Sequence, residues 1–197
     1  MSSAHSRGNP DPLAAALDAA ATRILDAVRG LGASNPVVLI DGRSGAGKTT
    51  LARELVARWP MHGRVQLVAL DQVYPGWDGL QDGVEAAREL ILTPHGRGIL
   101  GVWQRWDWDG SAYAEAHAVD PALPLIVEGS GLLTPTTARL GDVRVWLEAP
   151  ADARKRRALA RDGETYRPHW NQWAEQEERH LSRDDPQHHA THVFAMP

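Results

Sequence analysis

The stretch that most constrains this chain runs from Val37 to Thr50. The apolar run Val37–Ile40 leads through Asp41 into a segment that fits the pattern G-x-x-x-x-G-K-[ST] without a gap: Gly42, Arg43, Ser44, Gly45, Ala46, Gly47, Lys48 and Thr49. The glycines allow the backbone to curl so that several N–H groups point at one anion. A helix opening at Thr49 and continuing through Thr50 adds the positive end of its dipole. The sequence therefore predicts a phosphate-binding loop at Gly42–Thr49, with Thr50 completing the nucleotide-binding set.

Two side chains of this loop carry chemistry. Lys48 can reach the terminal phosphates of a bound nucleotide, and the Thr49 hydroxyl can hold the magnesium ion that accompanies them. Lysine occurs only at Lys48 and Lys155, while arginine supplies the rest of the positive charge, which favours a specific role for Lys48. The alternative is a chance glycine-rich turn, but the apolar strand before the loop and the helix after it are the context that the motif requires.

Composition limits the class of protein. A chain of 197 residues suits one domain, and we expect a disordered lead-in at 1–11 followed by a single domain at 12–197. A formal charge of −4 gives no general attraction to nucleic acid or to an anionic membrane, and the absence of cysteine excludes disulfides and thiol catalysis. Neither a signal-type segment nor an apolar run of about 20 residues is present. We therefore expect a cytoplasmic enzyme that binds neither nucleic acid nor membrane, of unknown oligomeric state.

Apolar runs alternate with amphipathic segments along the chain. The apolar runs predict strands at 37–40, 65–70, 125–127, 143–147 and 192–194. The amphipathic and polar runs predict helices at 12–31, 50–59, 84–92, 152–162 and 168–180, with a short helical segment at 136–140. Residues 99–108 form either a short strand or a hairpin on the rim. This alternation predicts an α/β fold with a parallel sheet flanked by helices.

Two acidic residues follow predicted strands. Asp71 follows the strand at 65–70, and Glu128 ends the strand at 125–127. Because ligands of an open parallel sheet bind beyond the carboxyl ends of its strands, we expect both carboxylates to face one crevice with the loop. Asp71 is placed to accept a proton from an attacking hydroxyl or to hold magnesium through water, and Glu128 to orient the water shell of the metal. The alternative is that each carboxylate merely caps the following turn.

An arginine-rich run occupies residues 154–162. On a helix, Arg154, Arg157 and Arg161 share one face, while Lys155 and Arg156 point elsewhere. Arginines that close over a phosphoryl group stabilise the charge that develops on its oxygens during transfer. The position of the run, after the strand that follows the crevice, favours a lid. The alternatives are a solvated basic face or a nucleic-acid patch.

The sequence contains eight tryptophans but a single phenylalanine. We expect Trp59, Trp146 and one of Trp170 and Trp173 to be packing residues. The other four lie in turn-rich segments on the acceptor side of the crevice, where they would either stack on a flat substrate such as a base or pack the rim: Trp77, Trp103, Trp106 and Trp108.

Three histidines near the end of the sequence have a spacing seen in metal sites. They are His188, His189 and His192. No carboxylate or cysteine partner accompanies them in a motif, so we expect a solvated tail rather than a metal centre.

Taken in order, four segments resemble the uridine kinase-like branch of the P-loop kinases, which includes nucleoside, pantothenate and related small-molecule kinases. The loop resembles that branch's G-x-S-G-x-G-K-[ST] motif (Walker A), and Asp71-Gln72-Val73-Tyr74 is similar to its D-D-F-Y segment. Ile126-Val127-Glu128-Gly129 resembles its apolar-E-G segment. Arg154–Asp162 is similar to its lid motif, R-x-x-R-R-x-x-x-R-D. The resemblance covers residues 37–162.

The resemblance implies a three-layer P-loop NTPase fold with a small arginine-rich lid. It implies that Asp71 is the general base, that Tyr74 contacts the acceptor, and that Arg157 and Arg161 meet the phosphates of ATP. The chain departs from the family at Gln72, where the family has a second Asp, and over residues 74–80, which do not follow the acceptor-loop pattern of true uridine kinases. The segment 105–108 matches their Y-D-F segment only loosely. The donor half therefore matches the family, and the acceptor half does not.

We therefore expect an ATP- and magnesium-dependent kinase acting on a hydroxyl of a small molecule, a nucleoside or nucleotide being one candidate. Its expected catalytic residues are Lys48, Asp71, Arg157 and Arg161; its magnesium ligands are Thr49 and Glu128; its acceptor contacts are Tyr74, Trp77 and Trp106. The alternative is an ATP-binding regulatory or interaction module with little turnover, which the unusual acceptor loop supports. A GTP switch is a third hypothesis, but no N-K-x-D segment is present to bind guanine.

Overall fold

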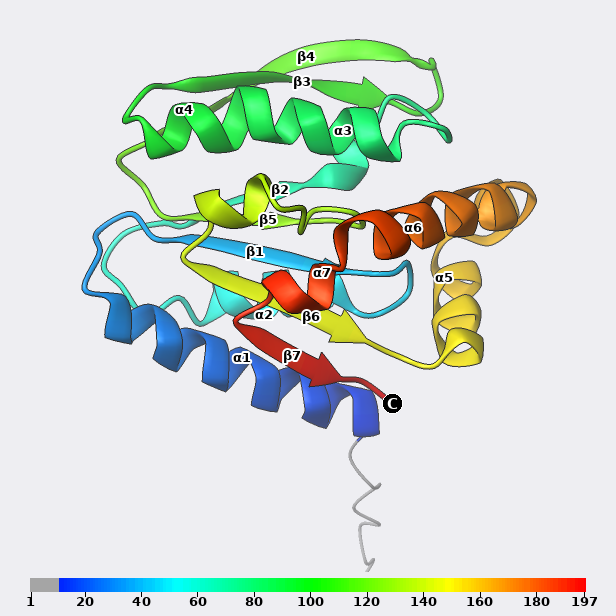
Figure 1. Cartoon of the computed structure of the whole chain (residues 1–197), viewed down its shortest axis with the longest axis horizontal. Helices are drawn as coiled ribbons and strands as arrows, with labels where there is room; N and C mark the ends of the chain where they lie inside the picture. Colours follow the sequence, from blue (N-terminus) through cyan, green and yellow to red (C-terminus); the bar gives the residue numbers. More distant parts are fainter. Residues whose placement is uncertain (1–10) are drawn as a thin grey trace, which may run out of the picture.

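The computed structural model describes residues 11–197, so the lead-in expected at 1–11 lies outside it apart from Asp11. The described chain contains a five-stranded sheet in the order β2-β5-β1-β6-β7, with helices on both faces (Figure 1). Its strands are β1 (Val37–Gly42), β2 (Gln66–Ala69), β5 (Leu125–Glu128), β6 (Val143–Glu148) and β7 (His192–Ala195). Every pairing in this sheet is parallel. The predicted α/β class and its three layers are confirmed.

The register of the strands brings the predicted site together. Ile40 of β1 pairs with Glu128 of β5, which also pairs with Ala69 of β2. Asp71 follows immediately in a short 3-10 turn, Leu70–Gln72. Since all the strands run the same way, the loop, Asp71 and Glu128 leave the sheet at one edge.

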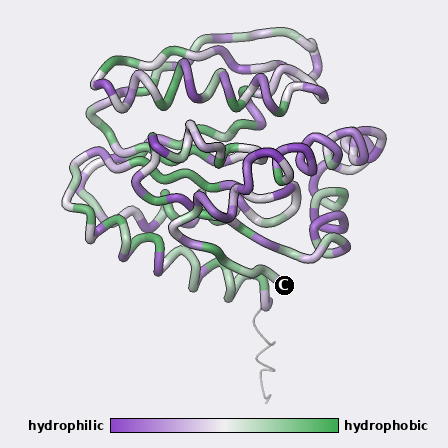
Figure 2. Tube along the Cα trace, viewed as in Figure 1, coloured by the Kyte–Doolittle hydropathy of each residue, from purple (hydrophilic) through white to green (hydrophobic). Residues whose placement is uncertain are grey.

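The central strand β1 is buried along its whole length. Val38 and Ile40 pack with α1 (Pro12–Leu31) and α2 (Lys48–Ala57), whereas Val37 and Leu39 pack on the opposite side with α3 (Leu80–Ala87). A strand covered on both faces needs apolar residues at every position, which explains its uninterrupted apolar run. Figure 2 shows hydrophobic colour along the strands and much of α1, and hydrophilic colour along α5 and α6.

The helix α1 begins and ends where the sequence predicts. The Asp11 side chain accepts a hydrogen bond from the Leu13 N–H at 3.1 Å, and Pro12 occupies the first turn. Gly32 closes the helix in the left-handed region, with φ of 65°. This helix is the longest in the described part of the chain, and no helix of that part is long and apolar enough to cross a membrane.

The helix predicted at 84–92 is longer than expected. It begins with α3 at Leu80, passes through a π-helical turn at Arg88–Leu92 and ends with α4 (Thr93–Gly96). Pro94 does not stop it because the proline falls in the first turn of α4, where its missing N–H is tolerated. Of the two structures predicted for residues 99–108, the short strand is the one present, as β3 (Gly101–Asp107). It pairs with β4 (Ala112–Val119), which lies beyond the predicted range, and the resulting hairpin lies beyond α3 and α4, outside the main sheet (Figure 1).

The last third of the chain is helical and returns to the sheet. It contains α5 (Ala151–Tyr166), α6 (Trp170–Asp184), the short α7 (Pro186–His189) and β7, after a 3-10 turn at Thr137–Leu140. The predicted strand at 192–194 is confirmed. The segment expected as a solvated tail around His188, His189 and His192 is only partly so: His188 is exposed in α7, whereas β7 pairs with β6 from His192 to Ala195.

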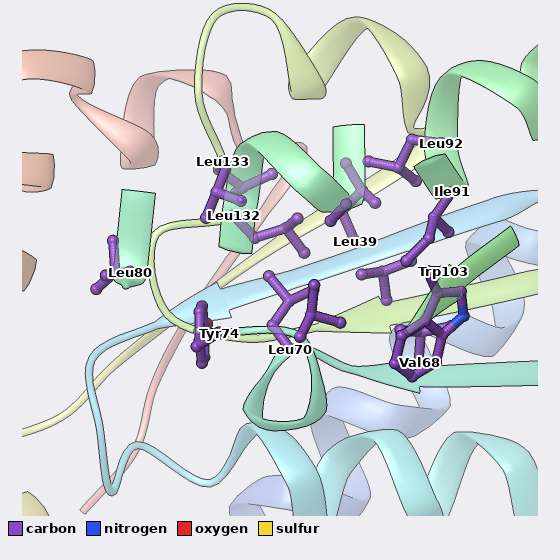
Figure 3. Close-up of a cluster of buried hydrophobic side chains, with 14 of the residues drawn as sticks. Leu39, Val68, Leu70, Tyr74, Leu80, Ile91, Leu92, Trp103, Leu132 and Leu133 are labelled. Atoms are coloured by element: carbon purple, nitrogen blue, oxygen red, sulfur yellow. The ribbon is translucent and has the colours of Figure 1, made fainter. Parts of the chain in front are cut away.

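Leu39 should be a strong determinant of stability. It is completely buried in the cluster drawn in Figure 3, between Leu132 and Ile91. We expect Leu39→Ala to lower the free energy of unfolding by about 2–5 kcal/mol, through lost transfer energy and the cavity left behind. Leu67→Ala, at a position 37% exposed on the edge strand β2, should cost under about 1 kcal/mol. Urea unfolding of both variants measures the difference, and equal losses would contradict this account of the core.

Candidate functional site

The backbone of the loop depends on its glycines. Gly42, Gly45 and Gly47 all have positive φ, at 148°, 79° and 107°. A Cβ atom on Gly45 would overlap the backbone of Arg154 in α5, and one on Gly42 would overlap the Leu147 carbonyl of β6. The loop is therefore wedged between the end of β6 and the start of α5, and its conformation is inaccessible to other residues at these positions.

The loop ends at an unsatisfied helix terminus. Within the described residues, no side chain caps the N-terminus of α2, where Gly47 is the N-cap. The N–H groups of Lys48, Thr49 and Thr50 begin the helix and have no carbonyl of an earlier turn to bind. Several free N–H groups together with the positive end of a helix form an anion-binding site.

A cavity of about 230 Å³ lies at this terminus. The residues that line it are Leu13, Ser44, Gly45, Gly47, Lys48, Thr49, Thr50, Asp71, Glu128, Ser130, Arg157, Ala158 and Arg161. The fold thus brings together all of the residues predicted to act as catalytic groups or magnesium ligands. Three loop residues lie elsewhere: Gly42 closes β1, Ala46 is buried in the core, and Arg43 turns toward α6.

The Lys48 ammonium is held at the start of the loop. It donates to the Gly42 carbonyl at 2.7 Å, to the Arg43 carbonyl at 3.3 Å and to Ser130 Oγ at 3.1 Å. All three partners are neutral oxygens, so the positive charge has no carboxylate bound directly to it. Phosphate oxygens would be stronger acceptors for this ammonium than the carbonyls are.

Thr49 and Glu128 form the oxygen pair that magnesium would require. The Thr49 hydroxyl donates to Glu128 Oε1 at 2.9 Å, and both residues line the cavity. Burial raises the pKa of Glu128, an effect partly opposed by the charge of Lys48. A hydroxyl and a carboxylate are oxygen donors of the kind magnesium takes, so the residues fit the ion. Residues 11–197 contain no cluster of three or more His, Asp or Glu that could hold a metal, so phosphates and water would supply the other ligands.

Asp71 presents an exposed carboxylate to the cavity. Its side chain is 62% exposed, and the Trp108 indole donates to its backbone carbonyl at 2.7 Å, which fixes the turn. The nearest cation is Arg161, with Nη2 lying 3.9 Å from Asp71 Oδ2. The carboxylate is thus accessible to an incoming hydroxyl and lies beside a positive charge.

Three of the four arginines of α5 contact the loop or the cavity, and they have two different roles. Arg154 is buried and donates to the Ala149 carbonyl at 3.1 Å and to the Ser44 carbonyl at 3.2 Å. Arg157 donates from Nε to the Gly45 carbonyl at 2.8 Å, and Arg161 pairs with Asp162 at 2.6 Å. The predicted shared face is present, since all three side chains reach the loop or the cavity. Arg154 holds α5 on the loop and is not among the described residues that line the cavity.

The structure does not bring the predicted acceptor contacts to the cavity. Tyr74 is fully buried, and its hydroxyl donates to the Ser130 carbonyl at 2.8 Å. Trp77 stacks on His169 with centroids 4.3 Å apart, and Trp106 makes an edge contact with Tyr113 of the hairpin. None of these three predicted contacts is among the described residues that line the cavity. Acceptor binding by these three residues therefore stays a prediction, and in the free protein their rings pack against neighbouring side chains.

Sequence reasoning missed a buried polar network behind the loop. Asp41 is fully buried, and its carboxylate accepts from the N–H groups of Gly42, Gly131 and Leu133 at 2.6, 2.9 and 2.7 Å. His180 of α6 contacts the same carboxylate at 3.1 Å and Asp184 at 2.8 Å. The available signal was a set of polar residues at helical spacing in α6: Gln176, Glu177, His180 and Asp184.

The Asp41–His180 contact raises the pKa of His180 and lowers the pKa of Asp41, in each case against the effect of burial. Burial would lower the pKa of His180, but hydrogen bonds and charges from Asp41 and Asp184 raise it above its ordinary 6.5. Burial would raise the pKa of Asp41, but the contacts with His180 and the backbone amides lower it. Both shifts favour the ionised pair in the folded chain.

This pair should make stability depend on pH. Because the folded pKa of His180 lies above the unfolded value, its contribution is complete below about pH 6.5 and is lost as pH rises through the folded pKa. His180→Gln should therefore lower the free energy of unfolding by about 3 kcal/mol near pH 6, with a smaller loss near pH 9. Exposed His188→Gln is the control. Unfolding curves at both pH values measure the effect, and a loss independent of pH would refute the ion pair.

No family model matches the chain, and no curated protein matches its sequence. Solved structures do match its fold. A possible uridine kinase from Bacillus stearothermophilus aligns with a TM-score of 0.66 and 19% identity, covering 92% of this chain and 98% of its own. A candidate fructose transport system kinase from Silicibacter sp. TM1040 aligns with a TM-score of 0.54 and 18% identity, covering 90% of this chain and 98% of its own. The chain therefore shares the fold of these structures.

Proposed function

We propose that this protein is an ATP- and magnesium-dependent kinase that phosphorylates a hydroxyl group of a small molecule. The observation that carries the proposal is the single cavity in which a free helix terminus, Lys48, an exposed carboxylate at Asp71 and two arginines converge. Two of the solved structures with this fold are described as a possible uridine kinase and as a candidate kinase of a fructose transport system, which supports a small hydroxyl-bearing acceptor.

The donor half would hold the triphosphate of ATP. The loop amides and the start of α2 bind phosphate oxygens, and the Lys48 ammonium exchanges its carbonyl partners for them. Arg157 and Arg161 add positive charge from α5 on the other side of the cavity. These groups stabilise the charge that spreads over the oxygens of the moving phosphoryl group.

The acceptor half would act through Asp71. Its carboxylate accepts the proton of the acceptor hydroxyl, whose oxygen forms a bond to the γ-phosphorus of ATP. The bond between that phosphorus and the β–γ bridging oxygen breaks, and ADP leaves with the electron pair. Thr49 and Glu128 would hold magnesium, which when bound neutralises charge on the phosphates. Most of the acceleration comes from positioning and electrostatics.

One observation favours the alternative, an ATP-binding module with little turnover. The aromatic side chains beside Asp71 cover one another: Trp77 stacks on His169 and Tyr166, and its ring lies 4.6 Å from that of Trp108. An acceptor needs room beside Asp71, and this cluster limits it. A screen of hydroxyl acceptors with ATP and magnesium separates the two functions, because only the kinase yields a phosphorylated product and ADP in equal amounts.

Asp71→Asn should separate transfer from binding. Loss of the proton acceptor should lower kcat by about a hundredfold or more, while the affinity for ATP changes little because the donor contacts remain. Asp82→Asn, at an exposed position on α3, is the matched control and should retain wild-type rates. Steady-state kinetics and calorimetric ATP titration measure the two quantities. Full turnover by the Asp71→Asn variant would exclude Asp71 as the base.

Thr49→Val should remove the effect of magnesium on ATP binding. Valine keeps the shape of threonine but lacks the hydroxyl that would contact the ion. We expect magnesium to strengthen ATP binding at least about tenfold in the wild-type protein and much less in the variant, with equal affinities for magnesium-free ATP. Titrations with and without magnesium give this comparison. An unchanged magnesium dependence would contradict the assignment of Thr49.

A further inference from the structure

The helix α6 buries a polar face against the edge of the sheet that carries the site. Gln176, Glu177, His180 and Asp184 are all buried and lie at spacings of three and four residues along one side of the helix. Figure 1 shows α6 beside the end of β1 from which the loop leaves. A helix that buries polar side chains must satisfy their hydrogen bonds. Glu177 and His180 bond the loop and Asp41, which precedes it, whereas Gln176 bonds the segment at 77–80.

Glu177 makes the closest contacts with the loop. Its Oε1 accepts from the Ser44 N–H at 2.6 Å and from the Ser130 hydroxyl at 3.0 Å, and its Oε2 accepts from Arg43 Nε at 3.1 Å. Only 2% of the residue is exposed. One buried carboxylate thus fixes a backbone amide and a side chain of the loop, as well as the segment that follows β5.

The contacts continue from Glu177 to Lys48. Ser130 Oγ donates toward Glu177 and accepts a hydrogen bond from Lys48 Nζ at 3.1 Å. The position of the Lys48 ammonium is therefore linked to α6 through a single hydroxyl. Glu177 itself is not among the described residues that line the cavity, so it contacts the loop from outside.

We propose that Glu177 is a positioning residue that fixes the phosphate-binding loop and Lys48 before nucleotide binds. A loop rich in glycine loses much conformational entropy when it is ordered. If Glu177 orders it in the free protein, that cost does not oppose ATP binding. This role rests on the proposed function, because it assigns the loop to ATP.

The charge of Glu177 is compatible with this role. A carboxylate near a phosphate site would repel the ligand if it were unpaired. Here Arg43 neutralises it directly, with Arg43 Nε lying 3.1 Å from Glu177 Oε2. The opposite role, in which Glu177 occupies an amide that phosphate must take, predicts tighter ATP binding when the charge is removed.

The first test uses amide hydrogen exchange on the free full-length protein. Glu177→Gln keeps the shape of the side chain but places an amide NH₂ against one of its three donors, so at least one contact is lost. We expect exchange in the loop peptide 42–50 to accelerate about tenfold to a hundredfold, as for the loss of a hydrogen bond to a charged group. The peptide 12–31 of α1 is the internal reference.

Glu178→Gln is the matched control. It makes the same chemical change one residue later, at a side chain that is 63% exposed and pairs with Arg43 at 3.0 Å. An exposed pair contributes little, so loop exchange should change less than about fivefold. Equal acceleration in the two variants, or none in Glu177→Gln, would overturn the proposal.

ATP titration supplies the second test. Glu177→Gln should weaken ATP binding about tenfold, and Ser130→Ala should add little in that background, because both act through Lys48. If Glu177→Gln accelerates exchange throughout the chain, the exchange test cannot isolate the loop and the ATP titration decides. Additive losses of ATP affinity in the double variant would then refute the link between Glu177 and Lys48 through Ser130. Tighter binding by Glu177→Gln would also refute it. Failure of the wild-type protein to bind ATP would count against the proposed function, while the exchange result still decides whether Glu177 orders the loop.

Discussion

The carboxylate of Asp41 is the contact on which the arrangement of the site depends. It stands where the central strand becomes the phosphate-binding loop, and it binds the amides of Gly42, Gly131 and Leu133 together with His180. These partners come from three separate segments of the chain. A fully buried carboxylate must have all of its acceptor capacity satisfied, so the loop, the segment after β5 and α6 have to meet at this point.

The features of the fold that follow from local pattern were predictable. Val37–Ile40 identified a strand buried on both faces, and Asp11, Pro12 and Gly32 marked the ends of α1. The strand at 112–119 was not identified, because all but its last residue, Val119, are exposed or half-buried and the segment has no apolar periodicity. The end of the helix at 80–96 was misjudged because a π-helical turn changes where a proline is tolerated.

In the candidate site, too, some features could be predicted from local sequence pattern and others could not. Lys48, Thr49, Asp71 and Glu128 could be placed in one cavity because strand ends in a parallel sheet share an edge. The packing of Tyr74 and Trp77 and the contacts of Glu177 could not be predicted, since each depends on partners more than fifty residues away. Tertiary contacts of that kind leave no signal in local periodicity. Those four residues that line the cavity can therefore be predicted from the sequence, and the packing of Tyr74 and Trp77 and the contacts of Glu177 cannot.

The position of α6 near the end of the chain has a consequence for biosynthesis. Ser44 and Glu177 are 133 residues apart, and Asp41 and His180 are 139 apart. When β1, α2 and β5 have already emerged from the ribosome, the nascent chain still lacks the helix that binds the loop. Contacts at such separation require closure of a long segment and form late. The order of translation thus makes the glycine-rich loop and its cavity one of the last parts of the molecule to reach its final geometry, after the loop's own residues have left the ribosome.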